Sequence, residues 1–476
     1  MKNKLVVLGA GPAGINTALS ASSLGMNVTL IDENDQAGGQ IYRAKNKSFV
    51  SVHKNPESIE GDQLRQRLVN SPVGVQYNSR IWHLERDNAK FNISVLNEKG
   101  NRVISTDKLL LSTGAQERIF PVPGWTLPGV MGLGAATALL KGQMVVPGKR
   151  VLVAGTGPLL LVVAHEILRM GGKVIAIVDL NPLSAWIKKT PALMSSPRLV
   201  SRGAGWIVRI LMNRVPIYSG FGLISIEGEK YVEAVNIGKV DATWMLTGKQ
   251  KHKFDVDCVC MAQGLVPATE TSQLLGAKQE FNPDEGGWKP ACDQYGRTSV
   301  PGLLVAGDCA GIQGAEAALI RGELATLAAA ADFGIISADD VEHRSTDLLK
   351  RLKRVRKFGG AMTLLSNPRA GLIKAMTDDT IICRCEDIRL KDVITEIAAG
   401  NRMPNTIKST TRCGMGPCGG RYCSETVAML ACEILGMPRS QWGQASARSP
   451  IRPVKIGKIS GDFSYEELPI PASAPL

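Results

Sequence analysis

The chain has 476 residues, of which 44% are hydrophobic and 21% are charged, ordinary values for a globular protein that exclude a largely disordered chain. The formal net charge of +13 favours acidic partners: nucleic acid, an anionic membrane surface, an acidic subunit or anionic small molecules. The sequence contains no run of ~18 uninterrupted apolar residues, so we expect no membrane-spanning helix.

The first predicted unit, residues 4–34, consists of a strand, a glycine turn, a helix and a second strand. Gly9, Gly11 and Gly14 form the pattern G-x-G-x-x-G, and Asp32 ends the second strand. These glycines permit a tight turn, close approach of backbone to a pyrophosphate and close packing of the helix, while the acid suits a ribose hydroxyl. The unit therefore predicts dinucleotide binding. Because glycines interrupt the apolar start at once, we interpret it as a strand rather than a signal peptide and expect a cytoplasmic protein.

A second unit of the same design covers residues 148–181. Its turn contains Gly155 and Gly157, but Leu160 replaces the third glycine, and Asp179 ends the following strand. We expect the leucine to push the helix off the strand and to distort the phosphate turn. This favours an empty relic or a static adenine nucleotide over turnover of NAD(P)H.

Three further segments have the pattern of a buried strand followed by a turn: 107–124, 254–267 and 301–330. The last continues through Gly307-Asp308 into an alanine-rich helix. This order predicts a first nucleotide domain that is interrupted by a second one and then resumed.

A basic segment, KRLKRVRK, covers residues 350–357. Leu348, Leu352 and Val355 follow helical spacing, which predicts an amphipathic helix with a basic outer face. Two interpretations stay open: a solvated helix after a domain boundary, or a surface that docks onto a partner subunit or a membrane.

Five of the ten cysteines lie between residues 383 and 423. They form a C-x-C pair and a C-x4-C pair, with Cys413 ahead of the second pair. Gathered thiolates repel one another, so the cluster predicts a bound metal, and the spacing leaves both a [2Fe–2S] cluster and zinc open. We interpret the remaining thiols as core residues: Cys258, Cys260, Cys292, Cys309 and Cys432.

The turns at Gly307-Asp308 and at residues 112–115, STGA, resemble those of flavoproteins with two dinucleotide-binding domains, of the glutathione reductase type. The resemblance covers roughly residues 1–330 and implies an α/β fold with two interleaved Rossmann-like domains and FAD in the first. The implied cofactor-binding residues are Gly9, Gly11, Pro12, Ala13, Gly14, Asp32, Glu33, Gly39, Gln40, Thr113, Gly114, Gly307, Asp308, Gly314 and Ala315.

The motifs CRCE and K-x-x-T-R-x-G-M-G-P-C-x-G-R-x-C resemble the [2Fe–2S] module related to bacterioferritin-associated ferredoxin. This resemblance implies a small α-helical C-terminal module in which Cys383, Cys385, Cys418 and Cys423 bind the cluster. The position of Cys413 varies in that pattern, so it is a reserve ligand or a bystander.

Together these patterns divide the chain into six predicted parts. They are the first part of the FAD domain (1–115), a degenerate second nucleotide domain (116–265), the return of the FAD domain (266–335), a basic helical linker (336–375), the [2Fe–2S] domain (376–438) and a tail (439–476). No redox cysteine pair of the disulfide reductase type is found near either glycine turn. None of the five histidines lies in a motif, so we nominate no catalytic residue.

Nearly the whole chain resembles the A (α) subunits of opine oxidases, hydrogen cyanide synthase and hydroxyproline or proline dehydrogenases. The resemblance implies a heteromeric enzyme that oxidises a C–N bond to an imine on a β subunit of the D-amino-acid-oxidase type, which carries its own FAD. The resemblance is also compatible with a small ferredoxin-like third subunit and with an FMN at the subunit interface. It is compatible, too, with attachment to the inner face of the membrane, where an acceptor takes the electrons. Nucleic acid is not an expected partner.

Two alternative functions stay open. One is a stand-alone NAD(P)H-dependent flavin and iron–sulfur reductase, against which Leu160 argues. The other is an assembly subunit whose thiols hold a structural zinc ion.

Overall fold

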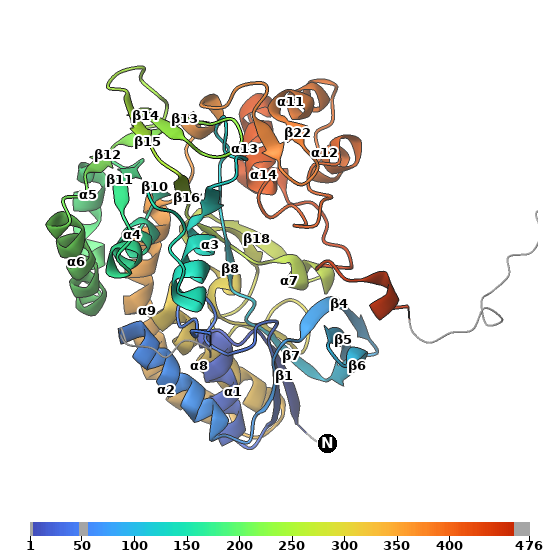
Figure 1. Cartoon of the computed structure of the whole chain (residues 1–476). Helices are drawn as coiled ribbons and strands as arrows, with labels where there is room; N and C mark the ends of the chain where they lie inside the picture. Colours follow the sequence, from blue (N-terminus) through green and yellow to red (C-terminus); the bar gives the residue numbers. More distant parts are fainter. Residues whose placement is uncertain (1–2, 47–55, 461–476) are drawn as a thin grey trace, which may run out of the picture.

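The computed structural model describes residues 3–46 and 56–460, and it consists of two α/β domains with a smaller module beside the second (Figure 1). The first domain is built on a parallel sheet of five strands in the order β20-β7-β1-β2-β3. The strands are β1 (Lys4–Leu8), β2 (Asn27–Ile31), β3 (Gly74–Gln76), β7 (Lys108–Leu111) and β20 (Leu303–Val305). Both faces of β1 are buried, which explains its uninterrupted apolar sequence.

The second domain has a parallel sheet of its own, in the order β12-β11-β10-β16-β9. Its strands are β9 (Val130–Gly132), β10 (Val151–Thr156), β11 (Val174–Asp179), β12 (Ile217–Ser219) and β16 (Cys258–Gln263). All of them lie between β7 and β20 in the sequence, so the chain leaves the first sheet after β7 and returns to it at β20. Cys258 and Cys260 are buried with their sulfur atoms 3.8 Å apart, which confirms the prediction of core thiols on one face.

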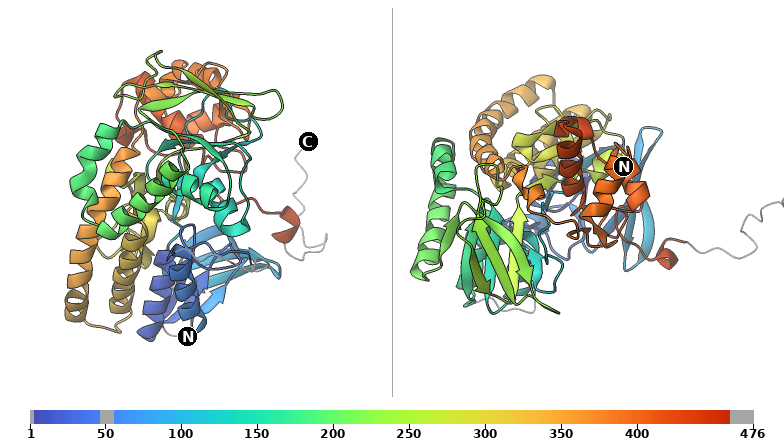
Figure 2. Two further views of the ribbon diagram at one scale, coloured as in Figure 1. Left: turned by 60° about the vertical axis from the view of Figure 1, so that its left-hand side comes forward. Right: turned by 90° about the horizontal axis from the view of Figure 1, so that it is seen from above.

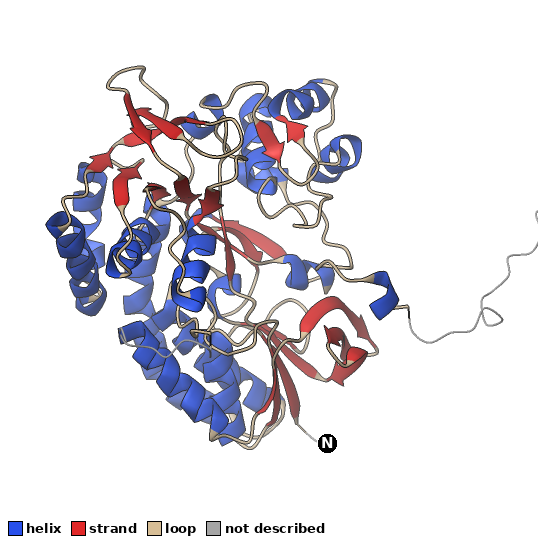
Figure 3. Ribbon diagram, in the orientation of Figure 1, coloured by secondary structure: helices blue, strands red, loops and turns tan. Residues whose placement is uncertain are grey.

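Antiparallel strands complete each domain (Figure 3). The first domain carries β4 (Arg80–Asp87), β5 (Lys90–Asn97) and β6 (Gly100–Thr106), and the second carries β13 (Phe221–Glu227), β14 (Ala234–Lys239) and β15 (His252–Asp255). Two ribbons lie between the domains and the module: β8 (Ala115–Glu117) with β17 (Leu265–Pro267), and β18 (Gln279–Asn282) with β19 (Gly287–Pro290).

Helices cover both sheets (Figure 2). In the first domain α1 (Pro12–Ser23) packs on α8 (Ala315–Asp332), and a Cβ atom at Gly322 would lie 2.5 Å from the carbonyl oxygen of Ala13. Glycine is therefore required where these two helices cross. The other helices of the two domains are α2 (Pro56–Val69), α3 (Leu133–Ala138), α4 (Leu159–Arg169), α5 (Leu183–Leu193), α6 (Pro197–Met212) and α7 (Glu270–Leu274), with a π-helical turn at Leu139–Gln143.

The basic segment forms part of a long helix, α9 (Ala338–Leu365), which Ser337 caps. Leu348, Leu352 and Val355 are buried against α8, which confirms the predicted amphipathic helix. Helix α9 continues past α8 to contact α5 of the second domain, so it joins both domains along one side of the molecule (Figure 2). The predicted linker is thus a packed structural element.

The C-terminal module contains α11 (Leu390–Ala398), α12 (Pro404–Thr411), α13 (Ser424–Leu435) and the short α14 (Arg439–Trp442). It also contains a two-stranded hairpin, β21 (Ile381–Cys383) with β22 (Ile388–Arg389), which the expectation of a small α-helical module did not include. The chain reverses direction between these strands, so Cys383 ends β21 and Cys385 lies in the turn that follows. The short α10 (Gly371–Lys374) precedes the module, and Phe120, Leu180 and Trp244 of the second domain join the core of the module.

The segment predicted as a tail is packed over its described part, which ends at residue 460. The N–H group of Ile451 donates to the carbonyl oxygen of Trp82 on β4 (2.9 Å), and Ser449 contacts Nδ1 of His83 (2.6 Å). Residues 439–460 therefore run from the module back to the first domain (Figure 1).

A buried arginine directly after β8 joins the module to both domains. The Arg118 side chain is 3% exposed, and its Nε atom lies 3.4 Å from a carboxylate oxygen of Glu425 on α13. The guanidinium also donates to the carbonyl oxygens of Gly286 (2.8 Å) and Ser366 (3.4 Å). Burial lowers the pKa of Arg118, whereas Glu425 raises it, so this cation depends on its partners.

We expect Arg118→Met to lower the free energy of unfolding by about 3 kcal/mol, because it leaves buried carbonyls and a carboxylate without their cation. The measurement is urea denaturation. The control is Arg150→Met, whose side chain is 48% exposed and lies 3.8 Å from Asp255, and which should cost less than about 0.5 kcal/mol. Equal midpoints for the two variants would show that the buried contacts do not hold the module.

Candidate functional site

The first glycine turn has the geometry that dinucleotide binding requires. Gly9 has a φ of +99°, and a Cβ atom at Gly14 would lie 1.9 Å from the carbonyl oxygen of Gly9, so the helix sits directly on the turn. A Cβ atom at Gly11 would meet nothing within 4 Å, which leaves open space where a phosphate would approach. The helix that begins at Pro12 directs its N-terminus toward this space.

The acidic and polar residues around this turn have different environments. Asp32 is buried and accepts hydrogen bonds from the N–H groups of Ala10 (2.5 Å) and Asn34 (2.8 Å), so it supports the turn itself. Glu33 is half-exposed, with Arg452 3.8 Å away. Gly39 lies against Gly11, at 3.0 Å for a Cβ atom.

The exposed Gln40 lies in the same turn as Gly39, and its side chain accepts hydrogen bonds from Arg43, the shorter at 3.0 Å. The side-chain oxygen Oε1 of Gln40 is therefore already hydrogen-bonded to Arg43.

The two later turns meet the first one. A Cβ atom at Gly307 would lie 2.9 Å from the Cβ of Ala13, so the turn after β20 lies beside the start of α1. Gly314 (φ +88°) caps α8, which begins at Ala315. Burial raises the pKa of Asp308, against hydrogen bonds from the N–H groups of Gln313 and Gly314.

Thr113 and Gly114 follow β7 in the connecting turn, where Gly114 has a φ of +75°. The hydroxyl of Thr113 donates to the carbonyl oxygen of Ala268 (3.4 Å). The structure thus brings the predicted residues of three separate segments to one edge of the first sheet.

The second glycine turn is filled by the chain itself. Ser366, directly after α9, lies so close to Gly157 that a Cβ atom there would be 2.6 Å from its hydroxyl oxygen. A Cβ atom added at Gly264 would lie 2.6 Å from the Cβ atom of the same serine. The cavity that borders Gly155 and Leu180 at this edge has a volume of about 20 Å³, room for a single water molecule.

The acid of the second unit is also engaged. Asp179 is 6% exposed and accepts hydrogen bonds from the N–H group of Asn181 (2.9 Å) and the indole of Trp186 (2.8 Å). Asn181 in turn donates to the carbonyl oxygen of Leu365 (2.9 Å). Burial raises the pKa of Asp179 to about 6. Leu160, at the position of the missing third glycine, is buried in the hydrophobic core of the second domain.

The five clustered cysteines lie in the C-terminal module in two groups. The sulfur atoms of Cys383, Cys413 and Cys423 lie within 4.8 Å of one another, and all three residues are buried. Cys385 and Cys418 are half-buried and share a hydrogen bond. The thiol that the sequence pattern set aside, Cys413, therefore lies in the inner group.

Hydrogen bonds favour the thiolate form of Cys383 over the thiolate forms of Cys413 and Cys423. The thiols of Cys413 and Cys423 lower the pKa of Cys383 to about 2, with help from the N–H groups of Gly414 and Glu386. The same contacts raise the pKa of Cys423. A sulfur that accepts several N–H donors suits a metal-bound thiolate.

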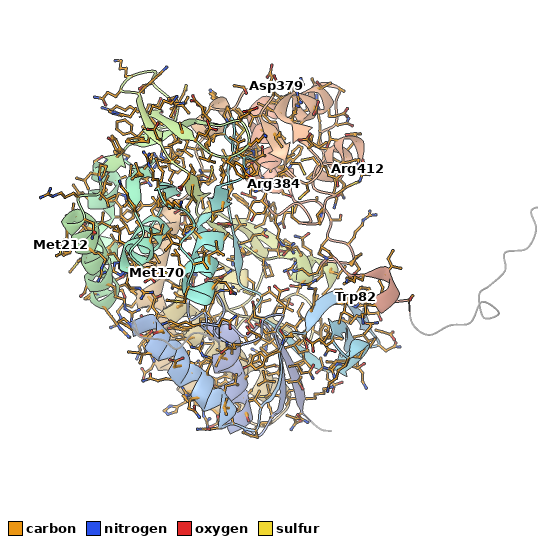
Figure 4. All side chains as sticks on the ribbon, viewed as in Figure 1. Trp82, Met170, Met212, Asp379, Arg384 and Arg412 are labelled. Carbon is orange, nitrogen blue, oxygen red and sulfur yellow. The ribbon has the colours of Figure 1, made fainter. Side chains whose placement is uncertain are left out.

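Glycines are needed for these thiols to meet. A Cβ atom at Gly416 would lie 2.3 Å from the Cβ of Cys385, and Gly414 has a φ of +90°. Arg384, between the two cysteines of the C-x-C pair, lies over the ring of Trp125 at 5.4 Å on the inner side of the module (Figure 4). Arg412 lies toward the outer edge and binds Glu386 at 2.8 Å.

The ribbon between the first domain and the thiols provides a direct connection. The hydroxyl of Tyr422, next to Cys423, lies 3.5 Å from a carboxylate oxygen of Glu117, only three residues beyond Gly114. Burial raises the pKa of Glu117, although the N–H group of Gly134 donates to it (2.7 Å). Neither Glu117 nor Tyr422 could be predicted from the sequence, because neither residue lies at a motif position that indicates this contact.

Comparisons with known proteins give a consistent result. Residues 3–332 match the family described as pyridine nucleotide-disulphide oxidoreductase. Among opine oxidase A subunits, that of Agrobacterium tumefaciens is 34% identical, over 96% of this chain and 91% of that protein. The HcnB chain of hydrogen cyanide synthase from Pseudomonas protegens is 27% identical, over 99% and 97% of the two chains.

Solved structures show the same fold. L-proline dehydrogenase from P. horikoshii aligns with a TM-score of 0.73 at 23% identity, over 96% of this chain and 79% of that one. Thioredoxin reductase from T. acidophilum aligns with a TM-score of 0.51 at 19% identity, over 70% of this chain and 99% of that one. Within the described residues, none of the helices has the length and apolar character needed to cross a membrane.

The buried acid of the second turn generates a pH prediction. The folded state holds the proton of Asp179 up to about pH 6, whereas the ordinary pKa of an aspartate side chain is 3.8. A rise from about pH 5 to about pH 7 should therefore destabilise the native protein at this site by about 1 kcal/mol. Asp179→Asn cannot ionise and should lack this loss. As the pH rises, the urea midpoint of the unsubstituted protein should therefore fall relative to that of Asp179→Asn. A constant difference across this range would contradict the raised pKa.

Proposed function

Because the chain belongs to the pyridine nucleotide-disulphide oxidoreductase family, with opine oxidase A subunits among its relatives, we propose that it is the electron-transferring subunit of a heteromeric amino-acid or opine dehydrogenase. The protein is an oxidoreductase. In the proposed complex, a partner β subunit oxidises a C–N bond to an imine, and this chain passes the electrons to a respiratory acceptor.

FAD is the proposed cofactor of the first domain. The open space at Gly11 and the two helix N-termini, at Pro12 and Ala315, suit a pyrophosphate and a ring system that accepts negative charge. Asp308 would bind the ribityl chain, and Thr113 and Gly114 would line the same edge. Bound FAD would supply reversible uptake of two electrons, while these residues would orient it.

A [2Fe–2S] cluster is the proposed group of the C-terminal module. In the ligand set that the sequence motif implies, Cys383 and Cys423 would bind from the inner group and Cys385 and Cys418 from the half-buried pair. Cys413 would then lie beside the cluster as a fifth thiol. The N–H groups that face Cys383 fit a thiolate ligand, and such a cluster would supply transfer of single electrons.

The observation that carries the proposal is the contact between Glu117, three residues after Gly114, and Tyr422, the residue before Cys423. The edge that holds Gly114 continues through β8 to Glu117, which contacts Tyr422 beside Cys423. The salt bridges Arg118–Glu425 and Arg421–Glu270 (2.9 Å) fix the module on both sides of this contact. A rigid and short separation is what electron transfer between two centres needs.

None of the five histidines lies in a sequence motif with a partner acid or nucleophile, which favours a partner subunit as the place where the organic substrate is oxidised. The names of two relatives, which denote one subunit each of opine oxidase and of hydrogen cyanide synthase, describe parts of assemblies. We propose a β subunit of the D-amino-acid-oxidase type that carries its own FAD, with room for an FMN at the interface and for a small ferredoxin-like third subunit. Attachment to the inner face of the membrane, where an acceptor takes the electrons, completes the proposal.

The alternative of a stand-alone NAD(P)H-dependent reductase is less well supported. Ser366 fills the second glycine turn, and Asp179 is already bound to Asn181 and Trp186. A nicotinamide dinucleotide, or a static adenine nucleotide, would have to displace the end of α9.

We expect Cys418→Ser to abolish iron binding while bound flavin stays, because each iron of a [2Fe–2S] cluster requires its thiolates. Cys413→Ser should retain both. The measurement combines iron and zinc analysis with the visible spectrum after anaerobic purification. The opposite pattern, with metal lost only in Cys413→Ser, would instead indicate a single metal ion held by Cys383, Cys413 and Cys423, which the 4.8 Å grouping of their sulfurs also allows.

We expect the chain expressed alone to show negligible oxidation of opines or amino acids, and NADH to leave its flavin oxidised. Co-expression with its partner should restore substrate-dependent bleaching of the flavin. Bleaching by NADH at a rate typical of enzymes, above about 1 s⁻¹, would support the stand-alone reductase. Robust amine oxidation by the isolated chain would contradict the division of labour between subunits.

A further inference from the structure

We propose that the cavity between α9 and residues 289–296 binds a small molecule that carries phosphate groups. The cavity has a volume of about 720 Å³, within the range of ligand sites. Its lining residues belong neither to a glycine turn nor to the five clustered cysteines, although the partly buried Cys292 is one of them. The inference that an anion binds here does not depend on the proposed function. Five cations line it: Lys289, Arg321, Lys353, Arg356 and Lys357.

The floor of the cavity is a buried carboxylate that faces several cations. The Glu285 side chain is 6% exposed and lies 3.0 Å from Lys289 and 2.8 Å from Arg356. Arg321 is 3.5 Å away. Burial alone would raise the pKa of Glu285, but these cations outweigh burial and hold it below its usual value. Lys289 also contacts Glu280 at 2.6 Å, so three cations face two carboxylates.

The wall formed by α9 adds uncompensated charge. Lys353 and Lys357 are exposed, and no carboxylate of the described residues lies within salt-bridge distance of either. The other acidic lining residue, Asp293, already faces Arg297 at 3.6 Å. The cavity therefore carries excess positive charge, and an anion with two or more charges would be attracted to it and could accept several charge-assisted hydrogen bonds.

The chemistry of the lining favours a small molecule over a macromolecular surface. Lys289 has a side-chain exposure of 7%, so its ammonium group is out of reach of a membrane or a flat protein face. The cations come from three elements, β19, α8 and α9, and line one partly open cavity. Tyr295, Leu349 and Leu352 supply an apolar wall for the rest of the ligand.

The floor of the cavity is connected to the turn that holds Asp308. The side-chain amide of Gln313 donates to Glu285, and its backbone N–H group lies 3.4 Å from a carboxylate oxygen of Asp308. An anion that draws Arg356 or Lys289 away from Glu285 would therefore change a hydrogen-bond network that ends at the proposed flavin site. A shift in the flavin absorption spectrum is a second readout, and this readout alone rests on the proposed FAD.

The experiment is isothermal titration of the full chain with inorganic pyrophosphate and, separately, inorganic phosphate. The test variant is Lys353→Gln with Lys357→Gln, and the matched control is Arg351→Gln with Arg354→Gln, two exposed cations on the same helix that do not line the cavity. We expect the test variant to weaken pyrophosphate binding by about tenfold or more, because each charge-assisted hydrogen bond is strong. The control should stay within about twofold.

Three outcomes would overturn the proposal. The first is no binding of either anion to the unsubstituted protein at millimolar concentration. The second is an equal loss in both variants, which would show diffuse attraction by the basic helix. The third is unchanged affinity in the test variant, which would place the anion elsewhere, for example at the first glycine turn.

Discussion

The buried guanidinium of Arg118 is the contact on which the arrangement of the molecule depends. It is bound by the carbonyl oxygens of Gly286 and Ser366 and by the carboxylate of Glu425, three segments that are far apart in the sequence. A cation out of water is stable only while such partners surround it, so the segments cannot separate without a large cost. The C-terminal module is in this way held against the ribbon that leads to the first sheet.

Helix α9 contributes to three parts of the structure. Its apolar face packs on α8, its C-terminal end places Ser366 in the second glycine turn, and its basic face forms one wall of the cavity above Glu285. The same helix that joins the domains therefore also fills the second glycine turn. This explains how a chain with two glycine turns comes to have only one with space for a phosphate among its described residues.

Much of the fold could be predicted from local patterns. Uninterrupted apolar runs indicated the parallel strands, and the spacing of Leu348, Leu352 and Val355 indicated an amphipathic helix. The cysteine spacing indicated a metal site but could not rank its thiols, since the position of Cys413 depends on how the loop after α12 turns back. The hairpin at Cys383 was missed because two-residue pairings leave little periodicity to detect.

The sequence by itself determined the elements, the two glycine turns and the gathering of cysteines, because these depend on residues within a turn or two of one another. The tertiary structure alone decided which turn stays open, which thiols become neighbours and where positive charge accumulates. Ser366 meets Gly157, Tyr422 meets Glu117 and Arg356 meets Glu285 only after distant segments pack. Contacts of this kind are set by the shape of the whole core, which no local pattern records.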